Sequence, residues 1–264
     1  FQAEDGIRDC LLSRGLGDVY KRQILTKKNR IQTFTEKGWW GKDTLYSLFQ
    51  DALTSCKDQE ALVDPENRED ITGDAPKRLS FDDIDKTVER YATIFFEQGL
   101  RKDDIAIIQL PNVVELPMVY LALSKLGIIC SPIPMQYGAY EITSIIAETK
   151  PKAFISIETF NSNAHAEQFS SIFNNGEVNF AFGEIENFIN LHDSNPTDES
   201  YESQQSYALD NQITANDIFT ICWTSGTTGT PKGVPRSHNL WLPMAKAAAF
   251  VSETEKGDLS LIHI

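Results

Sequence analysis

The chain has 264 residues, of which 41% are hydrophobic, enough for one large domain or two ordinary ones with a buried core. The net charge of −14 argues against a protein that binds nucleic acid or anionic membranes over a broad surface. No apolar run approaches the roughly 18 residues of a membrane-spanning helix. The four cysteines are widely spaced, without the histidine partners of a zinc site. We therefore expect a soluble, cytoplasmic protein without a metal site of its own.

The two ends of the chain are treated separately from the fold. Residues 1–23 show no sustained helical or strand period and resemble the translated sequencing-adapter read-through found at the ends of reading frames assembled from environmental DNA. Residues 259–264 (LSLIHI) resemble the matching adapter, although their leucines and isoleucines also suit a short strand. We interpret both segments as artefacts and expect the natural sequence to span residues 24–258.

The first predicted elements are two helices that flank a short strand. Apolar side chains recur at helical spacing between Thr44 and Cys56. Residues 61–63 are typical of a strand. Ser80 and Asp83 form the pattern of a capping box at the start of a second helix, which Gly99 ends.

Strands and helices alternate from residue 105 onward. The apolar runs 105–110, 128–133 and 153–157 are typical of strands that are buried on both faces. Helices are predicted between them, at 114–126 and 140–149. This alternation favours right-handed crossovers, so the predicted fold class is α/β, with layered parallel sheets and flanking helices. The order of the strands does not follow from the pattern.

The segment at about 190–216 differs in composition from the rest. Asp, Glu, Ser, Asn, Gln and Pro dominate it, so we expect a solvated loop there, with a domain boundary as the alternative. A strand at 218–223 and a helix at 239–250 are predicted to follow it.

The segment that indicates chemistry runs from Thr224 to Lys232 (TSGTTGTPK) and follows a predicted buried strand. Glycines let backbone amides approach phosphate oxygens, hydroxyls donate hydrogen bonds to the same oxygens, and lysine adds a positive charge. A kinase-type P-loop needs glycine directly before the lysine and Ser or Thr directly after it, but Pro231 and Gly233 stand there. The dinucleotide pattern Gly-x-Gly-x-x-Gly is absent too. Composition alone leaves a surface loop as the alternative.

The whole string resembles the signature of the adenylate-forming (AMP-binding) superfamily, which includes acyl-CoA synthetases, aryl-acid ligases and peptide-synthetase adenylation domains. The resemblance extends over most of residues 38–258, and we assign packing roles to its earlier motifs, such as Leu79-Ser80-Phe81 and Pro111-Asn112 with Glu115. It implies an incomplete N-terminal domain of such an enzyme. The residues that it implies for ATP binding are Thr224, Ser225, Gly226, Thr227, Thr228, Gly229, Thr230, Pro231 and Lys232.

The resemblance implies a reaction in two steps. A carboxylate attacks the α-phosphorus of Mg²⁺-ATP to give an acyl-adenylate and pyrophosphate, and a thiol, usually that of coenzyme A, then takes the acyl group. The alternatives are an aryl-acid ligase that loads a carrier-protein thiol and a non-catalytic nucleotide-binding relative. In the family pattern, the aromatic/histidine segment of the acyl pocket, the adenine and ribose motifs and the C-terminal domain with its catalytic lysine lie beyond Asp258. No catalytic residue is therefore assigned, and residues 24–258 alone are expected to be inactive.

Several residues outside the loop have competing interpretations. His238 and Asn239 follow the loop as they do in many family members. A contact near the nucleotide or acyl pocket is one interpretation of the pair, and capping of the following helix is the role predicted for Asn239. Trp223 and Cys222 are predicted to be buried in the sheet. His165 has polar neighbours in the sequence and is predicted to lie on the surface.

Overall fold

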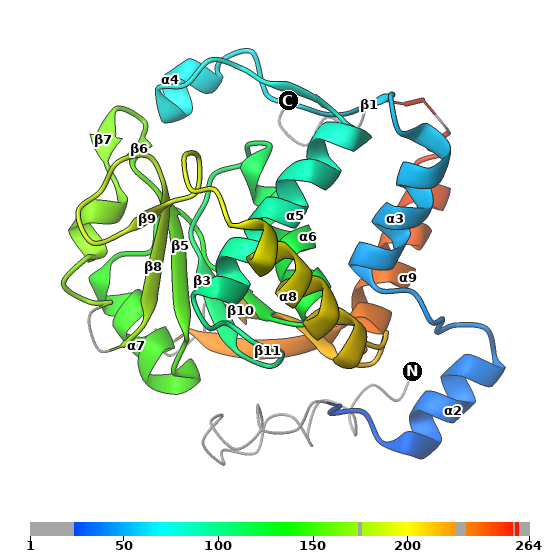
Figure 1. Ribbon diagram of the computed structural model, residues 1–264. Helices are drawn as coiled ribbons and strands as arrows, with labels where there is room; N and C mark the ends of the chain where they lie inside the picture. The colour runs from blue at the N-terminus through cyan, green and yellow to red at the C-terminus, as the bar shows by residue number, and fades with distance from the viewer. Residues whose placement is uncertain (1–23, 174–175, 225–230, 256, 259–264) are drawn as a thin grey trace.

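A seven-stranded sheet organises the part of the chain that the computed structural model describes, residues 24–173, 176–224, 231–255 and 257–258 (Figure 1). Its strand order is β11-β10-β4-β3-β5-β8-β9. Every pairing is parallel except the antiparallel pairing of β10 with β11. The predicted α/β class with a mainly parallel sheet is confirmed. The strands are β3 (Ile105–Ile108), β4 (Ile129–Pro132), β5 (Ala153–Ile157), β8 (Val178–Phe182), β9 (Ile189–Asn190), β10 (Ile218–Thr224) and β11 (Lys232–Ser237).

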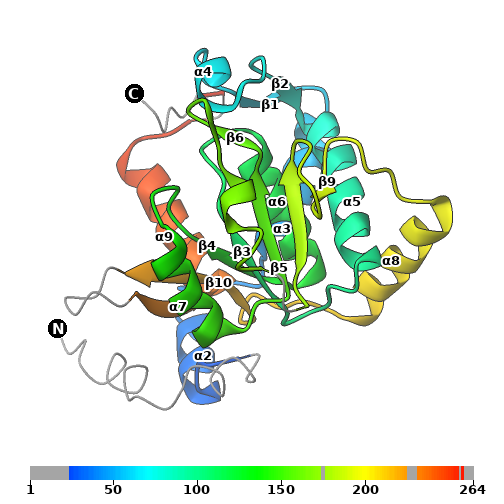
Figure 2. The same cartoon turned by 90° about the vertical axis from the view of Figure 1, so that its left-hand side faces the viewer.

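Helices cover both faces of this sheet, which explains why its central strands are mainly apolar and buried (Figure 2). One face packs against α3 (Leu45–Cys56), α5 (Phe81–Glu97), α6 (Glu115–Leu126) and α8 (Asp198–Asp210), and the other against α7 (Ala139–Thr149). Successive side chains of β3 enter different cores, since Ala106 and Ile108 belong to the first and Ile107 to the second.

Smaller elements surround this framework. They are α2 (Lys28–Glu36), β1 (Glu60–Val63), α4 (Arg68–Thr72), β2 (Arg78–Ser80), β6 (Thr159–Phe160), β7 (Asn163–Ala164), the 3₁₀ helix η2 (Ala166–Phe169) and α9 (His238–Val251). Within the described ranges, no helix has both the length and the apolar character that crossing a membrane requires.

The helix ends follow the signals in the sequence. The side chain of Thr44 accepts a hydrogen bond from the Ser47 amide at the start of α3, and that of Ser80 accepts one from the Asp83 amide at the start of α5. Gly127 ends α6 with a φ of 71°, a left-handed conformation that glycine adopts without strain. The predicted capping box of α5 is thus confirmed.

The solvated loop predicted at about 190–216 is wrong for half of its length, because α8 occupies Asp198–Asp210. Thr197 caps this helix, and its side chain accepts a hydrogen bond from the amide of Ser200. One aromatic residue attaches the helix to the core: the Tyr207 ring lies 5.3 Å from that of Phe96, and its hydroxyl accepts a hydrogen bond from the Lys102 amide at 2.7 Å. A polar sequence therefore forms a helix here through its cap and one anchoring side chain.

A buried cation joins three segments beside the sheet. The Arg68 guanidinium, on α4, has no exposed side-chain surface and donates hydrogen bonds to Asp64 at 2.6 Å and to both carboxylate oxygens of Glu115 at 2.8 and 2.9 Å. Asp64 also accepts the Val114 amide at 2.9 Å, directly before α6. Burial by itself raises the pKa of Glu115, but the hydrogen bonds and charges of Arg68 and Lys77 outweigh it and lower that pKa to about 2. Glu115 is therefore ionised at neutral pH. The positive charges of Arg68 and Lys77 stabilise the buried carboxylate.

We expect Arg68→Met to lower the free energy of unfolding by about 3–5 kcal/mol, because Asp64 would stay buried without its cation and Glu115 would keep only Lys77. Urea unfolding measures this change. The matched control is Arg78→Met, which removes an exposed pair with Glu60 at 2.7 Å; its expected cost is below about 1 kcal/mol. Equal costs for the two variants would contradict the structural role given to Arg68.

Candidate functional site

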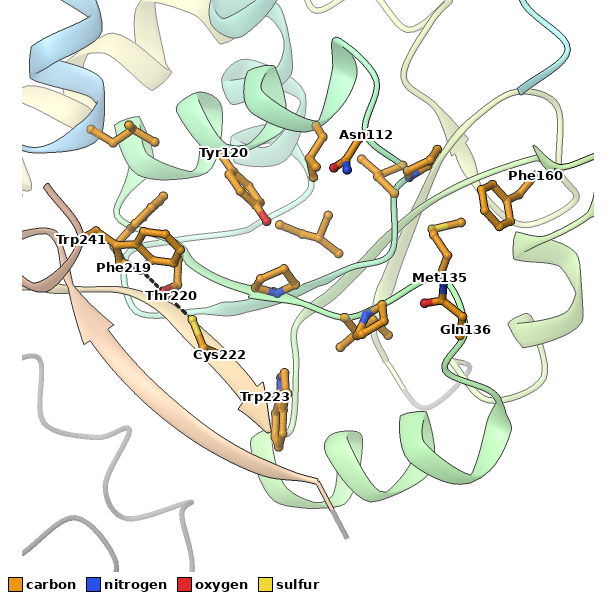
Figure 3. A pocket seen from close by; sticks show the side chains of 18 of the residues that line it. Asn112, Tyr120, Met135, Gln136, Phe160, Phe219, Thr220, Cys222, Trp223 and Trp241 are labelled. Carbon is orange, nitrogen blue, oxygen red and sulfur yellow. Dashed lines mark hydrogen bonds between the residues drawn. The ribbon is translucent and has the colours of Figure 1, made fainter. Parts of the chain in front are cut away.

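A largely apolar cavity of about 950 Å³ lies where β3, β4 and β10 end (Figure 3). Because these strands are parallel, their carboxyl ends meet at one edge of the sheet, which is where α/β folds bind ligands. Helices α6 and α9 and the β6–β7 hairpin complete the walls. Residues that line the cavity include Ile108, Leu110, Leu116, Tyr120, Pro132, Met135, Phe160, Phe219, Thr220, Cys222, Trp223, His238 and Trp241.

Aromatic rings dominate the wall between β10, α6 and α9, and their contacts fix them in place. The rings of Phe219 and His238 stack, with 4.7 Å between their centroids and 16° between their planes. Tyr120 meets Phe219 edge-on, at 6.2 Å and 87°. The Trp241 indole N–H donates to Thr220 Oγ1 at 2.6 Å, and the Trp223 indole N–H donates to Ser131 Oγ at 2.9 Å. This wall is therefore largely formed before a ligand arrives.

His238 is buried in this wall and serves as a hydrogen-bond acceptor. Its Nδ1 accepts a hydrogen bond from the Leu45 amide at 3.1 Å, at the first residue of α3. Burial lowers the pKa of His238 to about 4, although the charge of Asp217 opposes this shift. The imidazole is thus neutral at physiological pH, with its proton on Nε2.

The predicted capping role of Asn239 is wrong. Helix α9 begins at His238 with Ser237 in the N-cap position. The Asn239 side chain instead accepts a hydrogen bond from the Gly41 amide at 3.0 Å and donates to the Gly41 carbonyl at 3.2 Å. It also donates to Asn216 Oδ1 at 3.0 Å. Asn239 therefore connects the entry segment of the chain to α9.

The predicted phosphate-binding loop connects the two strands of an antiparallel hairpin. Thr224, at the end of β10, pairs with Lys232, at the start of β11, and both residues are exposed. Pro231 is buried. Ser225, Gly226, Thr227, Thr228, Gly229 and Thr230 lie outside the described residues. The ends of the loop stand next to the cavity, because Trp223 directly precedes Thr224 and lines it.

Gly233 has a steric role in the same hairpin. It pairs with Trp223 across the two strands. A Cβ atom at this position would lie 2.9 Å from Ile221 Cγ2 and 3.1 Å from the Trp223 ring. The absence of a side chain therefore leaves room for the indole that closes this end of the cavity.

Other predictions about single residues are corrected by tertiary contacts. Trp223 and Cys222 are half-buried and line the cavity, so they are not fully buried in the core of the sheet. His165 was expected on the surface, but it is only 5% exposed, between the rings of Phe160 and Phe169. The hairpin and the 3₁₀ helix fold back over this histidine, and burial lowers its pKa. Within the described ranges, no group of three His, Cys, Asp or Glu side chains is arranged to hold a metal ion.

The sequence did not indicate that the aromatic residues Tyr120, Phe219 and Trp241 line the cavity. A partial signal was available for Phe219 and Thr220, because they lie on a strand of the predicted parallel sheet that leads directly into the loop. Tyr120 and Trp241 lie on helices, and their orientation depends on how those helices pack on the sheet.

Comparison with known proteins identifies the family. The profile of the AMP-binding enzyme family matches residues 49–262, most of the chain. The chain belongs to the AMP-binding enzyme family. Pseudomonine synthase PmsE of Pseudomonas entomophila is 26% identical over 233 residues, covering 85% of this chain and 35% of PmsE. Medium-chain fatty-acid–CoA ligase of Escherichia coli is 21% identical over 233 residues, covering 86% of this chain and 38% of the ligase.

A solved structure also has a similar fold. The apo structure of MbtA from Mycobacterium smegmatis superposes with a TM-score of 0.71 at 19% identity and covers 88% of this chain and 41% of MbtA. The present chain spans about a third of the length of the curated relatives it matches, with shares of 35%, 33% and 38%. The match therefore concerns the part of the AMP-binding fold that holds the sheet, the cavity and the hairpin.

The neutral His238 predicts a pH dependence of stability. The folded-state pKa of about 4 lies below the ordinary value of 6.5. The stabilising contribution of the neutral ring is therefore complete above pH 6.5 and is lost as the pH falls toward the folded-state pKa. Protonation would also remove the acceptor for the Leu45 amide and place a cation at the N-terminus of α3.

Between neutral and acidic pH, we expect the free energy of unfolding of His238→Asn to fall less than that of the wild type, by on the order of 2 kcal/mol. The reason is that the amide oxygen of asparagine still accepts a hydrogen bond but does not titrate. The measurement is urea unfolding of both proteins between neutral and mildly acidic pH. Comparing the two proteins isolates His238 from His165 and His192, whose pKa values are also lowered. Parallel pH curves would contradict the assignment.

Proposed function

We propose that these residues belong to an enzyme that activates a carboxylic acid with ATP and then transfers the acyl group to the thiol of coenzyme A. The observation that carries the proposal is the position of the cavity beside the ends of the hairpin loop, Thr224 and Lys232. An acid held in the cavity and phosphates held by the loop would meet at the same edge of the sheet. The activity is proposed for an enzyme that carries these residues together with the segments that its relatives have in addition.

Charge repulsion is the obstacle to the first step, since a carboxylate must approach a polyanion. We assign Lys232 and the hydroxyl and amide groups of residues 224–230 to the β- and γ-phosphates, where they offset that repulsion and stabilise the leaving pyrophosphate. Mg²⁺, when bound with the nucleotide, would supply further positive charge there. The apolar lining of the cavity suits the body of the acid and excludes water from the reacting carboxylate.

The names of the relatives support two acceptors. A medium-chain fatty-acid–CoA ligase and a 4-coumarate–CoA ligase-like protein match at 21% and 27% identity, which favours coenzyme A. Proteins named as pseudomonine synthase and enterobactin synthase component E match at 26% and 23%, so a carrier-protein thiol is the alternative acceptor. A non-catalytic nucleotide-binding relative remains the second alternative.

The decisive experiment is acid-dependent exchange between ATP and pyrophosphate by a full-length protein that contains these residues. Exchange with release of acyl-CoA supports the proposal, and exchange with transfer only to a carrier protein supports the first alternative. Nucleotide binding without exchange for any acid would favour the non-catalytic relative. Residues 24–258 alone are expected to catalyse no exchange.

In the same assay we expect Lys232→Met to lower kcat/KM for ATP by about tenfold to a hundredfold. This factor corresponds to the free energy of one charge-assisted hydrogen bond. The matched control is Lys86→Met, which removes another exposed lysine, paired with Asp82 on α5. That variant should retain full exchange. An unchanged kcat/KM in Lys232→Met would remove Lys232 from the nucleotide site.

A further inference from the structure

Helix α2 and the turn after it carry a local excess of positive charge on an acidic protein. Residues 24–43 contain five basic and two acidic residues, a net charge of +3, whereas the remaining residues together carry −17. Asp43, one of the two acids, is already paired with Lys246 at 3.3 Å. Four exposed cations of the segment form no ion pair with a carboxylate in the described part of the chain: Lys28, Arg30, Lys37 and Lys42. Because salt screens charges more than about 10 Å apart, this local excess acts largely independently of the net charge.

The fold does not use the surface of α2. None of the nine residues of this helix is buried, and Figure 1 shows it standing apart from the sheet and the helices that cover the sheet. The chain is attached on either side of α2 instead. Leu25 packs against the core cluster that contains Ile218, and Trp40 is only 8% exposed. A helix of this length is marginal in water without packing, so a partner surface would stabilise it.

The cations and aromatic rings of this region form one continuous surface. The Arg30 guanidinium lies over the Phe34 ring, 5.1 Å from its centroid. The Phe34 ring lies 5.5 Å from the Trp39 ring, and the Lys37 ammonium lies 4.5 Å from the centroid of Trp39. We call these four residues the α2 surface. None of them lines the large cavity, so the α2 surface is separate from the candidate functional site.

Trp39 indicates which kind of anionic partner fits this surface. Its side chain is 56% exposed, although tryptophan is large and mainly apolar. An apolar ring with one polar N–H suits the headgroup level of a bilayer, where one end is apolar and the other is wet. The Lys37 ammonium covers one face of the ring, which hinders stacking of a nucleic-acid base there. In a bilayer the lysine stem can lie along the ring while its charge reaches the lipid phosphates. These contacts favour a lipid surface over a nucleic acid.

We propose that the α2 surface binds anionic phospholipid bilayers, with the Trp39 indole among the headgroups and Arg30 and Lys37 beside lipid phosphates. The protein then lies on the bilayer through one short helix and the turn after it. Each basic residue close to an anionic bilayer is expected to raise the partition coefficient about fivefold. The inference goes beyond the proposed function and does not depend on it.

The test measures how the complete 264-residue chain partitions onto phospholipid vesicles, by co-sedimentation. The vesicles contain phosphatidylcholine alone, or phosphatidylcholine and phosphatidylglycerol in equal parts. The double variant Arg30→Gln with Lys37→Gln removes two charges of the α2 surface. The matched control is Lys86→Gln with Lys152→Gln, which removes two exposed lysines elsewhere and gives the same net charge.

A second measurement locates the indole. Phosphatidylcholine with brominated acyl chains, mixed into the anionic vesicles, quenches the fluorescence of tryptophans that enter the bilayer. The variant Trp39→Phe removes the indole and keeps an aromatic ring beside Phe34.

The expected result is binding to the anionic vesicles that added salt weakens, with little binding to phosphatidylcholine alone. The double variant of the α2 surface should lower the partition coefficient about 25-fold, whereas the control should bind as the unchanged chain does. Brominated lipid should quench the unchanged chain and quench Trp39→Phe much less.

Several outcomes would overturn the inference. They are equal binding to both kinds of vesicle, no binding to either, an equal loss in the two double variants, and quenching that persists in Trp39→Phe. Tighter binding to a short DNA duplex than to anionic vesicles would assign the α2 surface to nucleic acid and overturn the lipid proposal as well. Pyrophosphate exchange by the full-length protein tests the proposed function separately.

Discussion

The parallel pairing of β3, β4 and β10 is the constraint on which the site depends. The register pairs Ile108 with Pro132 and Thr220 with Cys130, so the three strands run in the same direction and end at one edge. Segments far apart in the sequence, such as Pro134 after β4 and Trp223 on β10, are thereby brought to a common cavity. The two ends of the predicted phosphate-binding loop, Thr224 and Lys232, lie beside the cavity because the sheet has this register.

The buried charges around Arg68 extend that constraint to the cavity wall. Glu115 is the first residue of α6, and Tyr120 is on the same helix. The bonds from Arg68 to Glu115 and Asp64 therefore fix the start of the helix that presents Tyr120. The segment that carries Arg68 also supplies cavity-lining residues, Pro65, Asn67 and Ile71. A charge cluster outside the cavity thus determines the shape of one of its walls.

The sequence predicted those features that short-range physics controls. The helix cap at Ser80 follows from local hydrogen bonding, and the apolar runs of the central strands follow from burial on both faces. The role of residues 224–232 in phosphate binding stays a prediction, because six of these residues lie outside the described ranges. The fold class followed from the alternation of these elements.

Features that depend on distant partners were not predictable in the same way. Helix α8 has a polar sequence, and Tyr207 anchors it through contacts with Phe96 and Lys102. His165 is buried by aromatic residues that its immediate neighbours do not reveal. Strand β11 has an alternating pattern too weak to indicate a strand, since its sequence, KGVPRS, contains glycine and proline. It forms because the hairpin brings it alongside β10.

The bond between Asn239 and Gly41 joins residues that are 198 positions apart in the sequence. The contact between Leu45 and His238 spans 193 positions. During synthesis, the segment around Gly41 leaves the ribosome long before its partners on α9 exist. The backbone groups of Gly41 and the amide of Leu45 therefore stay without these partners until α9 has been made, and an undocked segment of this kind favours aggregation or chaperone binding. The order of translation thus makes the entry segment one of the last parts of the domain to dock.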